Sequence, residues 1–209
     1  MIAEVDQALG ELVRETPGVP KDVDVVFDAP TKDWAARRNA PTVNLYLYDI
    51  REDVRRRERG FVETRDDRGV IVTRAPGPRF FKLSYLVTAW TQRPEDEHRV
   101  LDGLLQALLP YDALPAELMS GTLAEVGRPV SVTVALPPPE DRAFADVWSS
   151  LGGELKPSLD VVVTVPMSTG VVYEAGPPVT AGVRGEFADI VAGGPAEQRA
   201  HNSREGGSK

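Results

Sequence analysis

The sequence predicts an α/β (α+β) fold in which helices cover a mixed β-sheet and a β-hairpin arm extends from it. Strand-like and helix-like hydrophobic patterns follow one another along the chain, and two of the strand patterns, at residues 41–50 and 80–90, are long. The charged segment between them, residues 51–79, contains two short apolar runs on either side of the turn Asp66-Asp67-Arg68-Gly69. Such a turn between two strand-like runs is typical of a hairpin.

The first part of the chain predicts one helix, two strands and a loop. Apolar residues at helical spacing, ended by Pro17-Gly18, predict an amphipathic helix at the N-terminus; they are Ile2, Val5, Leu9, Leu12 and Val13. Residues 23–27 are predicted to be a short strand, and residues 31–40 a polar loop or turn around Trp34. In residues 41–50 apolar and polar side chains alternate, which indicates a strand with one buried face and one tyrosine-rich face.

The middle of the chain predicts a strand followed by a well-defined helix. Residues 80–90 (FFKLSYLVTAW) form the strongest strand pattern of the sequence. Directly afterwards, Pro94 begins a helix whose first turn is acidic, as the helix dipole favours, and Pro110 ends it. A short turn of helix is expected at residues 115–119.

The remaining elements are a strand at residues 130–134, a short helix at 140–151 closed by Gly152-Gly153, and a last core strand at 159–165. The order of the strands in the sheet does not follow from the sequence. We expect one α/β domain over residues 1–166, an extended C-terminal segment over 167–192 and a disordered tail over 193–209.

The charge distribution is uneven. The net charge is −8, yet residues 51–79 hold nine arginines and six acidic residues, a balance of +3, so the rest of the chain sums to −11. An acidic protein with one basic segment argues against nucleic-acid binding, which needs a positive face. It is compatible with a segment that contacts acidic surfaces on other subunits.

Several cellular contexts are excluded or disfavoured by composition. The chain has no cysteine, which excludes disulfides, thiolate nucleophiles and Cys-based zinc sites. The N-terminus lacks the basic start and the apolar run of a secretory signal. No stretch approaches the roughly 20 apolar residues that cross a bilayer. We therefore expect a cytoplasmic protein without a membrane span.

The sequence holds no recognisable catalytic motif: no G-x-S-x-G elbow, no P-loop and no G-x-G-x-x-G. Glu95, His98 and Asp102 share one helical face, which is a weak pattern for metal binding and more typical of a solvated helix face. We therefore predict no enzyme activity, no cofactor and no metal. A hydrolase with an unrecognised site stays a remote alternative.

The arginine-rich segment is the candidate interface. It is either a solvated, charge-mixed loop or a surface whose guanidinium groups bind carboxylates of a neighbour. The strand-like runs that follow predict an arm that could reach a neighbour by strand addition or by charge pairing. The predicted interface residues are Arg51, Arg55, Arg56, Arg57, Arg59, Arg65, Arg68, Tyr46 and Tyr48.

Three segments, taken in their order, resemble a known family. They are PTVNLYLYDI with the arginine-rich stretch after it, FFKLSYLVTAW with EDEHRVLDGLLQALL, and FADVWSSLGGELKPSLDVVVTV. In combination they are similar to the tail-terminator, or tube-cap, proteins of phage-tail-like extracellular contractile injection systems. The similarity extends over about residues 1–166.

The resemblance implies a tail-terminator fold and a structural role. In that role the chain forms a homohexameric ring that caps the inner tube, ends its growth and anchors the contractile sheath. Its implied partners are other copies of itself, the inner tube protein and the sheath protein, and it implies no catalytic residues and no cofactor. An alternative within the same context is a phage tail-completion or adaptor protein at a head–tail-like junction.

Overall fold

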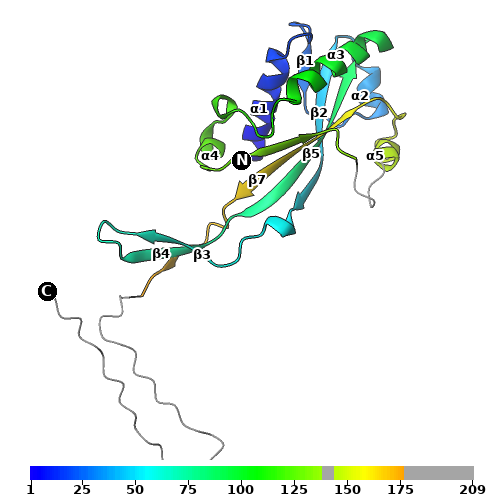
Figure 1. Cartoon of the computed structure of the whole chain (residues 1–209). Helices are drawn as coiled ribbons and strands as arrows, with labels where there is room; N and C mark the ends of the chain where they lie inside the picture. Colours follow the sequence, from blue (N-terminus) through cyan, green and yellow to red (C-terminus); the bar gives the residue numbers. More distant parts are fainter. Residues whose placement is uncertain (138–143, 177–209) are drawn as a thin grey trace, which may run out of the picture.

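The computed structural model describes residues 1–137 and 144–176, and a five-stranded mixed sheet lies at its centre (Figure 1). The strands, in spatial order, are β1 (Asp24–Val26), β2 (Thr42–Glu52), β5 (Arg79–Trp90), β7 (Leu159–Met167) and β6 (Ser131–Val134). Only β1 runs parallel to its neighbour, and the other pairs are antiparallel. This is the mixed sheet that the sequence predicts, with its two longest strands, β2 and β5, side by side.

One face of the sheet is covered by α1 (Ile2–Glu15), α3 (Pro94–Leu108), the 3-10 turn η2 (Ala116–Leu118) and α4 (Gly121–Ala124). Apolar residues of α1 and α3 recur at helical spacing and meet the alternate residues of the strands in the main core. The fully buried members include Val5, Leu9, Leu104, Leu123, Val43, Leu45, Leu83, Tyr85 and Val163. The periodicity of the sequence therefore identified the main core correctly.

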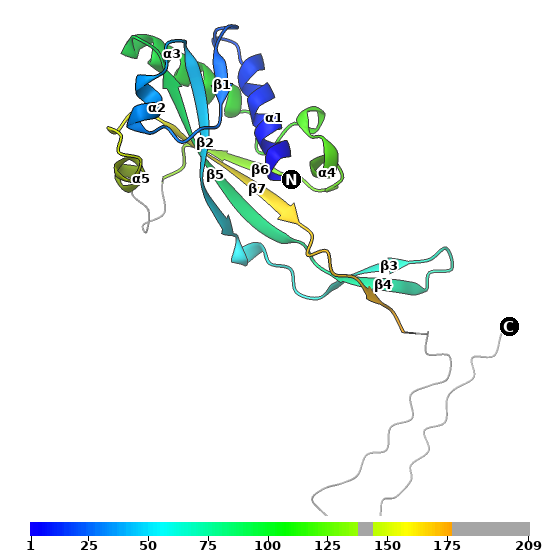
Figure 2. The ribbon, with the colours of Figure 1, turned by 180° about the vertical axis from the view of Figure 1, so that it is seen from behind.

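The opposite face is covered by two short helices, α2 (Lys32–Ala36) and α5 (Phe144–Ser150) (Figure 2). Tryptophan side chains also cover it. Trp90 of β5 packs edge-on against Trp34, with ring centroids 5.2 Å apart, and lies 6.5 Å from Trp148. The residues predicted as a loop around Trp34 form α2, because the Thr31 hydroxyl accepts a hydrogen bond from the Trp34 amide and caps the helix.

β5 is buried on both faces from Leu83 to Ala89. One set of side chains enters the main core, and Leu86 and Thr88 on the other side are equally inaccessible to solvent. Tyr85 is fully buried, and its hydroxyl donates a 2.6 Å hydrogen bond to Asp6 of α1. Burial and this hydrogen bond raise the pKa of Tyr85 well above its usual range.

The predicted hairpin is present as β3 (Phe61–Arg65) and β4 (Ile71–Pro76), joined at the Asp66–Gly69 turn. Asp66 Oδ1 accepts hydrogen bonds from the amides of Arg68 and Val70, and Gly69 has a positive φ of 79°. The 3-10 turn η1 (Val54–Arg56) precedes the hairpin. A further strand, β8 (Tyr173–Glu174), pairs with β4 and makes a second, three-stranded sheet of order β3-β4-β8.

Other predicted elements agree in type and differ in their ends. The helix predicted over 140–151 is α5, and Gly152, with a φ of 66°, ends it as expected; residues 138–143 lie outside the described part. The extended segment predicted over 167–192 contains β8 in its described portion, and the tail predicted over 193–209 also lies outside the described residues. Among the helices that the structure describes, none is long and apolar enough to span a bilayer.

Glu4 of α1 offers a test of the docking of α4. Its carboxylate lies 2.7 Å from the Met1 ammonium and accepts hydrogen bonds from the Thr122 amide and hydroxyl at 2.9 and 2.7 Å. The hydrogen bond from the ammonium, followed by those from Thr122, lowers the pKa of Glu4 from 4.5 to about 2. A Cβ on Gly121, which has a positive φ of 54°, would displace the Glu4 carboxylate from this position.

We expect Glu4→Gln to lower the thermal unfolding midpoint most strongly above pH 4.5, where the unfolded chain also carries a charged Glu4. The difference from wild type should shrink as the pH falls from 4.5 to about 2, because the unfolded chain binds a proton at Glu4 over this range while the folded protein stays ionised until the lower limit. The control is Glu125→Gln, an exposed glutamate without a hydrogen bond among the described residues. A Glu4→Gln difference that is independent of pH contradicts the assignment.

Candidate interaction surface on the arm

The three-stranded sheet β3-β4-β8 projects from the body as an arm (Figures 1 and 2). β2 leads into it and β5 leads out of it, so the arm lies at the end of the central strands where β2 finishes and β5 begins. β8 enters the arm from the end of β7, which places residues from two distant parts of the chain on one small sheet. All five residues of β3 are exposed.

Apolar side chains of the arm are exposed on both of its faces. Phe61 is 59% exposed and Val172 62%, and the others of this group are Val62, Val72, Val171 and Tyr173. Phe61 and Tyr173 contact each other edge to face, with ring centroids 5.8 Å apart. In the register of the strands Phe61 faces the same way as Arg74 and Tyr173, whereas Val62 faces the other way. A small sheet with both faces in water gains little stability from the burial of its own side chains. An exposed apolar cluster of this kind is suited to burial against a partner protein.

β3 also presents an open edge. It lies at the end of the order β3-β4-β8 and pairs only with β4 among the described strands. The outward backbone N–H and C=O groups of an edge strand are available for pairing with an extended segment of another chain. The arm therefore combines a strand edge with apolar side chains.

At the base of the arm, some of the predicted interface arginines pair with acidic residues of the chain itself. Arg57 binds Glu52 in bidentate fashion, with N–O distances of 2.8 and 2.6 Å, and Arg79 approaches the same carboxylate at 3.3 Å. The Arg57 guanidinium lowers the pKa of Glu52, and Glu52 in turn raises the pKa of Arg57. Glu52, at the end of β2, thus joins Arg57 to Arg79 at the start of β5.

Further contacts attach η1 to the face of the central sheet that lies opposite the main core. The guanidinium of Arg56 lies 4.2 Å from the centre of the buried Phe80 ring and donates a 3.0 Å hydrogen bond to Ser131 of β6. Lys82 of β5 pairs with Asp53 at 3.5 Å, and Arg128 pairs with Glu58. The base of the arm is therefore fixed to three strands of the body.

The remaining predicted arginines are exposed, and two of them, Arg65 and Arg51, also contact residues close in the sequence. Arg55 is 88% exposed, with only a long 3.8 Å approach to Asp53, and the exposed Arg59 makes no ion pair within the described residues. Arg65 contacts Glu63 and the Gly69 carbonyl on the hairpin, and the Arg68 side chain is exposed at the turn. Arg51, on β2, is more than half exposed and lies 3.1 Å from Asp49.

The two predicted tyrosines lie on the body, away from the hairpin. Both are half-buried on β2, and Tyr48 lies at a β-bulge between Leu47 and Asp49. Its hydroxyl donates a 2.9 Å hydrogen bond to Asp160 of β7 and so spans β5. The structure therefore places Arg55 and Arg59 at the base of the arm and Arg65 and Arg68 at the hairpin turn, and leaves Tyr46 and Tyr48 on the central sheet.

The apolar side chains of the arm were not among the predicted site residues. The runs Phe61-Val62 and Val171-Val172-Tyr173 were visible as short apolar stretches, but about 110 residues separate them in the sequence. A short apolar run is as typical of a buried strand as of an exposed one. The pairing of β8 with β4 is what places the two runs on the same exposed sheet.

No arrangement of side chains suited to metal binding is found in residues 1–137 and 144–176. His98 is exposed on α3, and Asp102 accepts a hydrogen bond from Gln106 at 2.9 Å. This is the geometry of a solvated helix face.

The fold resembles that of solved proteins of contractile particles. The family described as Pvc16 N-terminal domain matches residues 4–181. A PVC sheath/tube terminator, from an extracellular contractile injection system in its extended state, is similar with a TM-score of 0.66 and 26% sequence identity, over 91% of this chain and 65% of that one. The tube-terminating cap of the anti-feeding prophage has the same fold, with a TM-score of 0.61 and 24% identity, over 88% of this chain and 61% of that one.

The chain thus spans less than two thirds of the length of both solved proteins. Among curated proteins, none matches the sequence. The predicted tail-terminator fold is confirmed by the first of these structural similarities.

We expect the arm to be dispensable for the stability of the body, because it contributes no residue to the main core. Replacing residues 61–76 by a short Gly-Ser linker should change the thermal midpoint by no more than about 3 °C. The comparison variant is Leu83→Ala in the fully buried centre of β5, which should lose about 2–5 kcal/mol. Loss of cooperative unfolding on arm deletion would contradict this division.

Proposed function

The chain belongs to the Pvc16 N-terminal domain family, and from that premise we propose that it caps the inner tube of a phage-tail-like contractile injection particle. In this role it ends tube growth and gives the sheath its upper anchor. The observation that carries the proposal is the family match over residues 4–181. The projecting arm, with its exposed apolar and arginine side chains, supports it, since those groups are suited to contacts between subunits.

The proposal includes the assembly state and the location of the protein. The chain acts as a structural subunit, not as an enzyme, in a ring of six identical copies. A ring requires heterologous contacts, in which one surface of each copy meets a different surface of the next. The protein is made in the cytoplasm and becomes a component of the assembled particle.

The arm is the element that contacts the tube, the sheath or the neighbouring copy. Its open β3 edge suits strand addition, and the adjacent Phe61, Tyr173 and Val172 offer the apolar contacts that an added strand buries. Arg55 and Arg59 stand at the base of the arm, where they are free to meet carboxylates of a partner. Arg56 and Arg57 have a different task, because their contacts with Phe80, Ser131 and Glu52 hold the base in place.

The role of the arm can be tested by electron microscopy of particles. We expect the double variants Arg55→Glu/Arg59→Glu and Phe61→Ser/Tyr173→Ser to give tubes of uncontrolled length or particles with unstable sheaths. Both pairs are exposed, so the circular dichroism spectrum and the unfolding midpoint should stay those of the wild type.

The control for charge is Lys32→Glu/Arg37→Glu on α2, which reverses two exposed cations away from the arm. Particles with this variant should have the normal length. Particles of normal length with both arm variants would refute the role of the arm, and unchanged particles in the complete absence of the protein would refute tube capping.

A further inference from the structure

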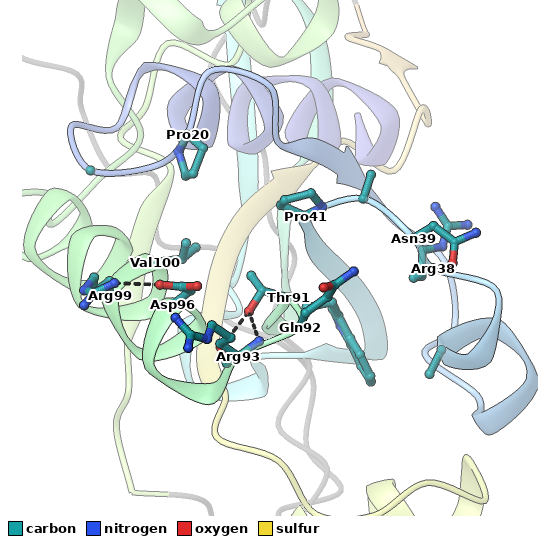
Figure 3. Close-up of a pocket in the computed structure, with 14 residues that line it drawn as sticks. Pro20, Arg38, Asn39, Pro41, Thr91, Gln92, Arg93, Asp96, Arg99 and Val100 are labelled. Atoms are coloured by element: carbon teal, nitrogen blue, oxygen red, sulfur yellow. Dashed lines mark hydrogen bonds and ion pairs between the residues drawn. The ribbon is translucent and has the colours of Figure 1, made fainter.

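A second surface lies at the other end of the central strands, where β2 begins and β5 finishes. There the loop after α1, the residues that follow α2 and the first turns of α3 surround a hollow of about 640 Å³ (Figure 3). Part of its wall is apolar, from Trp90, Val100, Pro20 and Pro41. We call this feature the cationic hollow, because of the charges that line it.

Three arginines and one acidic residue line the cationic hollow. Asp96 is already paired with Arg99 at 2.6 Å, and the guanidinium of the exposed Arg93 has no ion pair among the described residues. The Arg38 guanidinium lies 4.6 Å from the centre of the Trp34 ring and 3.6 Å from the Asp28 carboxylate. Its buried Nε has no hydrogen-bond acceptor among the described residues. The hollow therefore has a positive balance in a protein whose net charge is −8.

The opposite character is found at the other end of α3. Leu109 is 66% exposed and Tyr111 40%. Tyr111, Glu15 and Glu117 line a smaller groove of about 350 Å³. The exposed Asp112 follows directly in the sequence. None of these three carboxylates has an ion pair within residues 1–137 and 144–176. We call the exposed side chains in and beside this groove the acidic knob; they belong to Glu15, Leu109, Tyr111, Asp112 and Glu117.

We propose that the acidic knob of one copy docks in the cationic hollow of a second copy of this chain. The two surfaces match in kind: exposed apolar side chains meet an apolar wall, and unpaired carboxylates meet arginines. One chain carries both halves of the complementary pair, which favours a second copy as the partner. The inference rests on the proposed function only in naming one contact of the proposed ring.

The knob cannot fill the hollow of its own molecule. The first turns of α3 line the hollow, residues 109–112 of the knob follow the last turn of the same helix, and the loop that follows α1 packs between them against Gly103. A Cβ at Gly103 would lie 3.1 Å from the Pro17 carbonyl, so the loop sits directly on the helix. The two surfaces are therefore different patches at fixed positions, as a head-to-tail contact requires.

The contact predicts a complementation between two variants of the full chain. In the hollow variant, Arg93→Glu/Arg99→Glu, the hollow repels the knob, and in the knob variant, Asp112→Arg/Glu117→Arg, the knob repels the hollow. Each variant alone should self-associate on the order of a hundredfold more weakly than the wild type. An equimolar mixture should recover association, because each reversed surface then meets its opposite on the other variant.

Sedimentation of the purified proteins over a range of concentrations measures these equilibria. The matched control Lys32→Glu/Arg37→Glu, whose residues do not line the hollow, should associate like the wild type. Leu109→Ser/Tyr111→Ser should weaken association without any change in charge. A defect of folding would not be repaired by mixing, so the mixture separates a lost contact from a lost fold.

Three results would overturn the inference: a wild type that stays monomeric at all concentrations, variants that associate like the wild type, or a mixture that fails to recover. These outcomes are independent of those for tube capping. If mixing restores association but tube length does not depend on the protein, the knob and hollow stand and the proposed function fails. If mixing fails while tubes still end at normal length in its presence, only the knob and hollow fail.

Discussion

The structure depends on the burial of both faces of β5. From Leu83 to Ala89 this strand is inaccessible to solvent on either side, with the α1 and α3 core below it and the tryptophan cluster above it. It also supplies hydrogen bonds to β2 on one edge and β7 on the other. Because the covering helices pack on residues of this strand or its neighbours, β5 sets the positions of the helices on both faces of the sheet.

The same strand also separates the body from the arm. Its C-terminal half is covered, whereas its start at Arg79 leaves the core next to the exit of β2. Ion pairs and the Arg56–Phe80 contact, not apolar burial, connect the arm to the body there. A projecting sheet whose base is fixed but whose apolar side chains are uncovered is suited to contacts outside its own chain.

The proposed role places the contacts of the chain at two ends. The arm extends from one end of the central strands, and the cationic hollow lies at the other, with the acidic knob at the far end of α3. Opposed and dissimilar surfaces are what a closed assembly of identical subunits needs, since a self-complementary surface alone gives only pairs. The arginines divide accordingly: some of them, such as Arg57, hold the fold together, and others, such as Arg55, face solvent.

The sequence by itself determined the local elements, because hydrophobic periodicity reports which side of a segment is buried. Residues 80–90, the helix from Pro94 and the hairpin around Asp66–Gly69 were predictable for this reason. Only the tertiary structure decided the strand order, the pairing of β8 with β4 and the partner of each arginine. These depend on contacts between residues far apart in the chain, such as Arg56 and Ser131 or Tyr48 and Asp160, and no local pattern records them.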